Sequence, residues 1–331
     1  MTEEPEIAGG SAGPENAPGY PHVIVARAAM NTRWEIVLPG EDARFLRAAA
    51  GVALDEVDRL EAQLSIYRES SEVSGLNAYA AEGPVPVEPQ LFRLLQRAVE
   101  LSRDTEGAFD PTLGPLLRAW GFIGGSGSLP DPAAVAAARE LTGAGLLELD
   151  EEAFTLQFAR EGVWLDLGAI GKGYAVDRAV RELELVEITT GLVHAGTSTV
   201  YGLGAPPEAE GWSVALRDPR REEYAALGRV CLRDRALSVS APHGKSFREG
   251  DRLYGHVLDP RTGEPTHGAL LSAVAHPSAT VTDALSTGLL VLGAAGLSRL
   301  ADRYPDADFL VLDEQGAAHT AGAGKWDLRL S

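Results

Sequence analysis

The sequence predicts an α+β fold in which mostly antiparallel sheets are flanked by helices. Two observations predict this class. Amphipathic patterns with helical spacing dominate residues 41–103, whereas short apolar runs bounded by turn residues succeed one another from residue 191 onward. Runs of helices followed by runs of strands are typical of α+β proteins. The predicted sheet segments are interleaved with helices, so residues 21–331 are expected to form one domain.

Composition and charge limit the classes of function. The 331 residues are 45% hydrophobic and 23% charged, as in soluble globular proteins. The net charge of −19 argues against general nucleic-acid binding, which needs a basic surface. An anionic substrate must therefore meet a local positive charge, such as a metal ion or a lysine. The single cysteine, Cys231, excludes an intrachain disulfide.

The start of the chain predicts a tail, with no segment for export. Residues 1–20 are rich in Glu, Pro, Gly and Ala and predict a disordered acidic tail. They lack the basic start and apolar stretch of a signal peptide. No run approaches the roughly 18 apolar residues of a membrane span. We therefore expect a cytoplasmic protein without a membrane anchor.

The first half of the chain contains both kinds of pattern. Residues 22–29 and 33–38 predict strands joined by a short link, and residues 41–64 and 89–103 predict amphipathic helices. Ser70 or Ser71 is expected to cap a short helix that ends near Asn77. Prolines and glycines predict a loop over residues 105–116. The next expected elements are a helix at 132–142 and strands at 146–149, 154–158 and 162–167.

The second half is mostly β. Strands are expected at 191–195, 199–203, 212–216, 228–232, 236–240, 252–258 and 270–276. Helices are expected at 282–292 and 296–304, before a final core strand at 308–312.

Residues 165–177 predict a strand end, a glycine turn and the start of a helix. Gly168, Gly171 and Gly173 allow a close backbone approach, and Lys172 lies at the helix start. A helix N-terminus beside a lysine is suited to phosphate, with Asp166 just before the turn. An ordinary strand-to-helix connection explains the same residues equally well.

Four further segments are candidates for chemistry. One, residues 237–246, is a strand that opens into a small polar loop, which could contact a ligand, although serine-rich loops usually do not. Asp110, between an aromatic residue and a proline, presents a carboxylate from a loop or accepts the N–H groups of a turn. His256 with Asp259 suits a general base or a phosphate ligand, and equally a strand histidine and a turn aspartate. Asp283 and Thr287 share one helix face, which suits a Mg²⁺ site. The alternative is that Asp283 caps the helix and Thr287 faces the core.

Six motifs in order make the sequence similar to one family. They cover residues 23–312 and read Met30-Asn31-Thr32, Ser65-Ile66-Tyr67 with Leu76-Asn77, Gly107–Thr112 with Trp120-Gly121-Phe122, Asp166–Asp177, His256–Pro265 and Asp283–Gly293. With these motifs the chain resembles the FAD:protein FMN transferases, the ApbE-like flavin transferases. The resemblance implies a T-fold-like α+β architecture for residues 21–331.

The resemblance also implies site residues. FAD would contact Met30, Tyr67, Ala108, Phe109, Asp110, Asp166, Lys172 and Val257. Mg²⁺ would lie on Asp283 and Thr287, with the Ala169 carbonyl as a ligand and Ser286 close by. His256 would activate the acceptor hydroxyl, with Asp259 orienting it.

The implied activity is Mg²⁺-dependent transfer of FMN from FAD to a serine or threonine hydroxyl of an acceptor flavoprotein, with release of AMP. Two alternatives remain open. Water in place of the hydroxyl would give hydrolysis of FAD to FMN and AMP. Alternatively, the protein would bind FAD without catalysing a reaction. The sequence departs from the family pattern after residue 191, where Ala195-Gly196-Thr197 replaces Gly-Gly-Asp.

Overall fold

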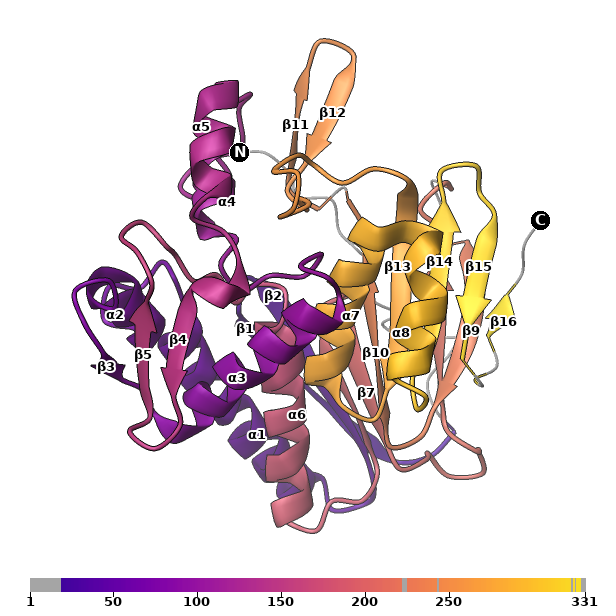
Figure 1. Ribbon diagram of the computed structural model, residues 1–331. Helices are drawn as coiled ribbons and strands as arrows, with labels where there is room; N and C mark the ends of the chain where they lie inside the picture. The colour runs from indigo at the N-terminus through magenta and orange to yellow at the C-terminus, as the bar shows by residue number, and fades with distance from the viewer. Residues whose placement is uncertain (1–18, 222–224, 243, 323, 325, 329–331) are drawn as a thin grey trace.

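The computed structural model describes residues 19–221, 225–242, 244–322, 324 and 326–328. Residues 1–18, nearly all of the predicted tail, lie outside this part. An eight-stranded antiparallel sheet forms the centre, in the order β1-β2-β6-β7-β10-β13-β14-β15 (Figure 1). Its strands are β1 (His22–Ala29), β2 (Thr32–Pro39), β6 (Gly191–Ala195), β7 (Thr199–Leu203), β10 (Arg235–Ser240), β13 (Ala269–His276), β14 (Asp308–Asp313) and β15 (Ala318–Ala321).

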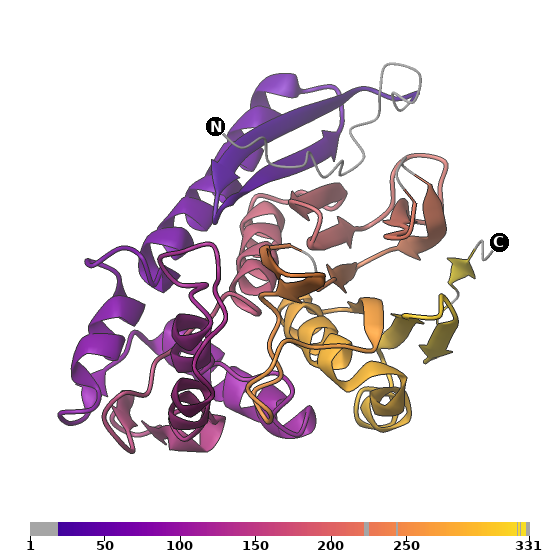
Figure 2. The ribbon, with the colours of Figure 1, turned by 90° about the horizontal axis from the view of Figure 1, so that it is seen from above.

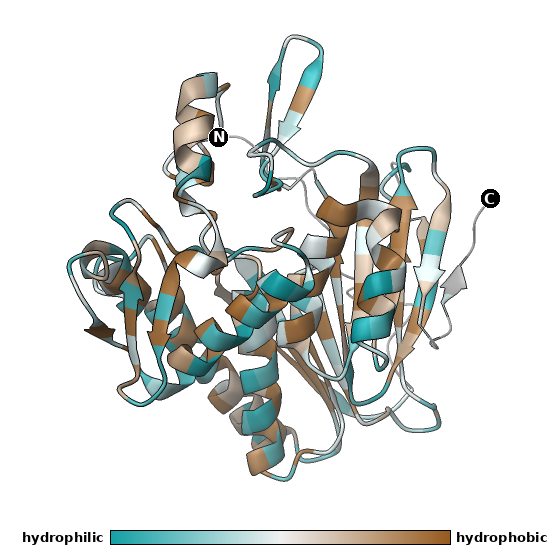
Figure 3. Ribbon diagram, in the orientation of Figure 1, coloured by the Kyte–Doolittle hydropathy of each residue, from teal (hydrophilic) through white to brown (hydrophobic). Residues whose placement is uncertain are grey.

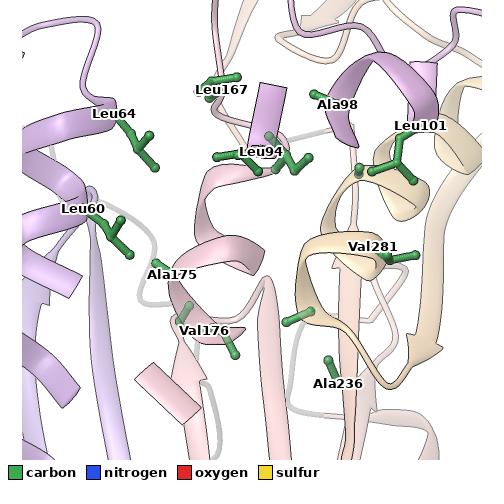
Figure 4. Close-up of a cluster of buried hydrophobic side chains, with 14 of the residues drawn as sticks. Leu60, Leu64, Leu94, Ala98, Leu101, Leu167, Ala175, Val176, Ala236 and Val281 are labelled. Atoms are coloured by element: carbon green, nitrogen blue, oxygen red, sulfur yellow. The ribbon is translucent and has the colours of Figure 1, made fainter. Parts of the chain in front are cut away.

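Helices cover one face of this sheet. They are α1 (Ala43–Leu64), α6 (Gly171–Leu185), α7 (Ala279–Leu292), the 3₁₀ turn η3 (Gly293–Gly296) and α8 (Leu297–Arg303). Helix α6 lies between α1 and α7, and in Figure 4 Leu60 and Leu64 of α1 face Ala175 and Val176 of α6. Apolar residues line the inward faces, and hydrophilic ones cover the outside (Figure 3). Burial of these faces supplies the main stabilisation.

The opposite face packs against a three-stranded sheet of order β16-β9-β8. Its strands are β8 (Trp212–Arg217), β9 (Ala226–Leu232) and β16 (Asp327–Leu328). Trp212, Leu216 and Leu227 pack there against Leu237 and Leu271 of the central sheet. This second core leaves the helical face as the side on which loops and helix ends can form a site.

A further layer covers the helices. It contains α2 (Glu72–Tyr79), α3 (Pro89–Asp104), η2 (Ala144–Leu146) and a small sheet of β3 (Val85–Pro86), β5 (Thr155–Phe158) and β4 (Leu147–Asp150). Helix α3 packs on α7. At one end α4 (Gly114–Ala119), α5 (Pro132–Arg139), β11 (Ser246–Glu249) and β12 (Arg252–Gly255) project from the body, and Figure 2 views that end. An apolar cluster with Trp120, Phe122 and Leu258 joins them.

Residues Ala279–Arg303 pass a length and composition test for a membrane span, with a mean hydropathy of 1.5. The run is not one uniform helix, because Gly293, with φ of 63°, ends α7. Of its apolar window, 56% is buried inside the fold. The apolarity of α7 is therefore that of a core helix between the sheet and α3.

Most predicted elements are present, with three corrections. Residues 162–167 form no strand, because the backbone of Leu165 pairs with the Asn77 side chain and the Asp166 N–H donates to Pro111. Helix α4 begins inside the predicted loop, with Pro115 in its first turn. A proline is tolerated there because the first N–H groups of a helix have no partner within the helix. Strand β12 ends at Gly255, so His256 follows the strand.

Candidate functional site

A cavity of about 670 Å³ gathers segments that are far apart in the chain. Its volume lies within the range of small-molecule sites. Of the predicted site residues, those that line it are Met30, Tyr67, Ala108, Phe109, Asp110, Asp166, Ala169, Lys172, His256, Val257, Asp283 and Thr287. Asp259 and Ser286 do not line it.

Two residues from the first part of the chain border the cavity. Met30 and Asn31, with φ of 49° and 57°, form the two-residue turn between β1 and β2. Both φ values are positive, as in a hairpin turn that matches the strand twist. Tyr67 follows α1 and is 62% exposed, so its ring is available to a ligand.

Asp110 holds a loop of the cavity wall. One carboxylate oxygen accepts from the Thr112 N–H at 2.8 Å and the Thr112 hydroxyl at 2.5 Å. The other accepts from Ser102 Oγ at 3.1 Å and the Ala144 N–H at 2.8 Å. Burial raises the pKa of Asp110, and these hydrogen bonds oppose the rise. The geometry supports the turn-aspartate interpretation over a carboxylate presented to a ligand.

Lys172 brings positive charge to the cavity of this acidic protein. Its Nζ donates to the Gly168 carbonyl at 3.2 Å, so the lysine lies against the glycine turn. Asp166 accepts from the Gly168 N–H at 2.7 Å. Burial raises the pKa of Asp166, whereas the Gly168 N–H and the charge of Lys172 lower it. The turn therefore brings a carboxylate and an ammonium group to the same cavity.

Helices α6 and α7 meet closely at Gly173. A Cβ atom there would lie 2.2 Å from the Ala279 carbonyl oxygen and 2.6 Å from the Asp283 Cβ. Only glycine allows this approach, which brings the Asp283 carboxylate to the start of α6. The Gly173 N–H donates to Asp283 Oδ2 at 2.9 Å. Asp177 strengthens the seam, since its carboxylate accepts from the N–H groups of Ala279 and Thr280.

Hard oxygen atoms of Ala169, Asp283 and Thr287 reach the cavity at this seam. Gly173 lies in the first turn of α6, where N–H groups have no partner within the helix, and its N–H donates to Asp283. The Ala169 carbonyl accepts no hydrogen bond from any described residue. Asp283 is 4% exposed, and its Oδ1 has one long contact of 3.5 Å with Thr199 Oγ1. Thr287 Oγ1 lies 3.3 Å from the Asp283 carbonyl oxygen.

Ser286 has no access to the cavity. Its side chain is fully buried, donates to the Asp283 carbonyl at 3.0 Å and lies 2.9 Å from Ser240 Oγ. Ser286 is next to Thr287 in the sequence, but its hydroxyl contacts the helix backbone and the neighbouring strand instead of the cavity.

His256 and Asp259 do not form the expected pair. His256 Nδ1 lies 3.1 Å from the Lys245 carbonyl and 3.2 Å from its backbone nitrogen. Asp259 binds the Arg261 guanidinium at 2.8 Å through both oxygens and caps the following turn. The prediction that Asp259 orients His256 is therefore wrong, because the carboxylate is already engaged and the Lys245 backbone holds the ring.

The environment of His256 favours the neutral imidazole. Burial lowers the pKa of His256, and the charges of Lys172 and Lys245 lower it further, against a backbone hydrogen bond at Lys245 that raises it. Its Nε2 makes no hydrogen bond to a described residue. A neutral imidazole with a free nitrogen at a cavity can accept a proton.

Lys245 is a cavity residue that was not among the predicted site residues, although it lies in the candidate segment of residues 237–246. Its Nζ donates to the Phe122 carbonyl at 2.6 Å, which ties the β11–β12 hairpin to the segment after α4. The polar loop that contains it was a signal for ligand contact, but serine-rich loops seldom have that role. Asn31, which belongs to the first motif, and Ser240, which lies outside all six motifs, also line the cavity.

The fold and the cavity define a class: α+β proteins with an antiparallel central sheet and a ligand-sized cavity at the start of a glycine-rich helix. Within that class, the chain belongs to the ApbE family, whose model matches residues 30–311. This agrees with the resemblance found in the sequence motifs.

Individual relatives support the same assignment. The chain is 30% identical over 307 residues to the FAD:protein FMN transferase of Klebsiella pneumoniae, covering 90% of this chain and 86% of the relative. The crystal structure of the ApbE protein from Thermotoga maritima superposes with a TM-score of 0.83, at 28% identity, over 91% of this chain and 97% of that one. The apo flavinyl transferase ApbE of Pseudomonas stutzeri gives 0.77 at 31% identity, over 91% and 94%.

Proposed function

We propose that the protein transfers FMN from FAD to a serine or threonine hydroxyl of an acceptor protein in a Mg²⁺-dependent reaction. One observation carries the proposal: residues from all six motifs of the family line one cavity. Relatives that the chain matches over most of its length are FAD:protein FMN transferases. FAD is the substrate, and the cavity residues named above would hold it, with Asp110 supporting the loop that borders it.

Three oxygen atoms at the α6–α7 seam fit Mg²⁺. The Ala169 carbonyl, Asp283 Oδ1 and the Thr287 hydroxyl are hard oxygen donors. Mg²⁺ in proteins takes one or two carboxylates and keeps several waters and substrate phosphates as ligands. Among the described residues no group of three or more His, Cys, Asp and Glu side chains could hold a metal, so the site is not of the zinc type. Bound there, Mg²⁺ would neutralise the pyrophosphate.

The residues of the chain then have separate roles. Lys172 supplies a second positive charge for the pyrophosphate. The acceptor oxygen attacks the flavin-side phosphorus, the bond from this phosphorus to the bridging oxygen breaks, and AMP leaves with the electron pair. His256 Nε2 accepts the proton of the hydroxyl. Such transfers depend mainly on positioning and charge neutralisation.

Incubation of the pure protein with FAD, Mg²⁺ and a Ser/Thr acceptor protein tests the proposal. We expect covalent flavin on the acceptor and an equal amount of AMP, measured by intact mass and chromatography. AMP without covalent flavin would indicate hydrolysis instead. FAD recovered intact would indicate a binding protein and contradict the proposal.

A cytoplasmic location remains our proposal, made from the sequence. It is checked by fractionating cells that express the complete protein. Recovery in the soluble cytoplasmic fraction is expected, and recovery with membranes would contradict it.

A further inference from the structure

A second cavity lies away from the first, between α3, α6 and the start of α7. Its volume is about 370 Å³, which is within the range for a small ligand. Helix α3 contributes Gln90, Arg93 and Arg97, and α6 contributes Tyr174 and Arg178. No residue is shared with the first cavity.

The lining charges are all positive. Arg93, Arg97 and Arg178 line the cavity, and no Asp or Glu does. This is unusual for a chain with a net charge of −19. The three guanidinium groups would attract an anion into the hollow, although carboxylates outside the lining, Glu100 and Glu56, already pair with Arg97 and Arg178. Guanidinium groups also match phosphate oxygens with paired hydrogen bonds.

The arginines keep donors available. Arg93 makes no hydrogen bond or ion pair with a described residue. Arg97 uses one terminal nitrogen on Glu100 at 2.7 Å, and Arg178 uses its Nε on Glu56 at 3.2 Å. The remaining guanidinium nitrogens of Arg97 and Arg178 have no partner among the described residues. A phosphate group could therefore bind without breaking an existing pair.

The rest of the lining suits the organic part of a ligand. Leu94, Val281 and the Tyr174 ring give the cavity an apolar wall. Gln90 Oε1 is buried and has no hydrogen-bond partner among the described residues. A buried acceptor without a partner is costly, and a ligand hydroxyl or amine would satisfy it.

The start of α7 is not the source of this site. Asp177 already accepts from the Ala279 and Thr280 N–H groups and from the Ser278 and Thr280 hydroxyls. The positive end of that helix is neutralised by this carboxylate. The arginines therefore carry the recognition of an anion.

We propose that the cavity between α3, α6 and α7 binds a small organic phosphate of about the size of a nucleoside monophosphate. The arginines bind the phosphate, the Tyr174 ring packs against the apolar part of the ligand, and Gln90 accepts a hydrogen bond from a hydroxyl or amine of the ligand. The site is separate from the FAD cavity and does not depend on the proposed function.

Isothermal titration calorimetry with AMP as the probe tests this site. We expect saturable binding that weakens as salt is added. Arg93→Gln should weaken AMP binding by about tenfold, the effect of losing one charge-assisted hydrogen bond. Arg47→Gln on α1 is the matched control, because Arg47 is exposed, lies outside both cavities and loses the same charge.

Lys172→Gln locates the binding. It should leave AMP binding at the second cavity unchanged while weakening FAD binding, and Arg93→Gln should do the reverse. The proposal is overturned if AMP does not bind, if Arg93→Gln has no effect, or if only Lys172→Gln weakens AMP. Inorganic phosphate or adenosine that binds as tightly as AMP would overturn the organic-phosphate assignment. Binding to anionic lipid vesicles that depends on Arg93, without AMP binding, would replace it by a lipid headgroup.

Discussion

Gly173→Ala is the substitution that tests how the fold builds the cation site. The added Cβ would lie 2.2 Å from the Ala279 oxygen and 2.6 Å from the Asp283 Cβ, well inside contact distance. Helices α6 and α7 must then separate, which also strains the 2.9 Å bond from the Gly173 N–H to Asp283. Overpacking of this kind costs about 1–3 kcal/mol.

Thermal unfolding and metal titration measure the two consequences. The cost corresponds to a fall in Tm of roughly 1–4 °C for a protein of this size. The Asp283 carboxylate would move away from the Ala169 carbonyl, so the Mg²⁺ concentration for half-maximal turnover should rise. Both effects follow from one steric contact.

Gly51→Ala is the matched control. Gly51 lies within α1, and a Cβ there would meet nothing within 4 Å. Alanine should stabilise that helix by about 0.5–1 kcal/mol and leave the Mg²⁺ dependence unchanged. If Gly173→Ala behaves like Gly51→Ala in both measurements, the close seam is not what positions Asp283, and the reasoning fails.

Three other substitutions probe the site. Asp283→Asn should lower turnover by about 100-fold or more in steady-state kinetics, as expected for lost charge stabilisation; turnover that stays Mg²⁺-dependent at the parent rate would contradict the metal assignment. The pKa of His256 is lowered, so the imidazole loses its base function only at pH values below the usual value of about 6.5. The pH–rate profile of the parent should lose activity there, and His256→Gln should abolish this limb; an unchanged limb would exclude His256 as the base. Asp110→Ala leaves the N–H and hydroxyl donors of the loop without a partner, which costs about 1–3 kcal/mol for each buried group. The control is Asp42→Ala at an exposed helix cap, which should cost about 1 kcal/mol. Urea unfolding should therefore show a larger loss of stability for Asp110→Ala than for Asp42→Ala. Equal losses would mean that the loop does not depend on Asp110.

Much of the fold could be predicted from local patterns. Strands β1, β6 and β7 have the bounds that the pattern of apolar residues predicted. Ser71 caps α2, as its position suggested. Short elements were harder to predict from the sequence. Strand β15 is four residues long with an amphipathic pattern too brief to recognise, and α4 starts at a glycine and a proline.

Contacts between distant segments explain the errors at the site. Nothing local indicates that the Gly173 N–H binds Asp283, 110 positions away. The backbone of Lys245 could not be foreseen as the partner of His256, since the nearby Asp259 offered a carboxylate. The motif order predicted which residues meet, but tertiary packing decides which atoms remain free.

A crystal structure with FAD and Mg²⁺ tests the central claim most directly. We predict a cation bound at about 2.0–2.1 Å by Asp283 and the Ala169 carbonyl, typical of Mg²⁺ with oxygen ligands, and in contact with the FAD pyrophosphate. The flavin-side phosphorus should lie on the side of His256. A cation elsewhere in the cavity, or a pyrophosphate away from Lys172 and the α6–α7 seam, would contradict the account.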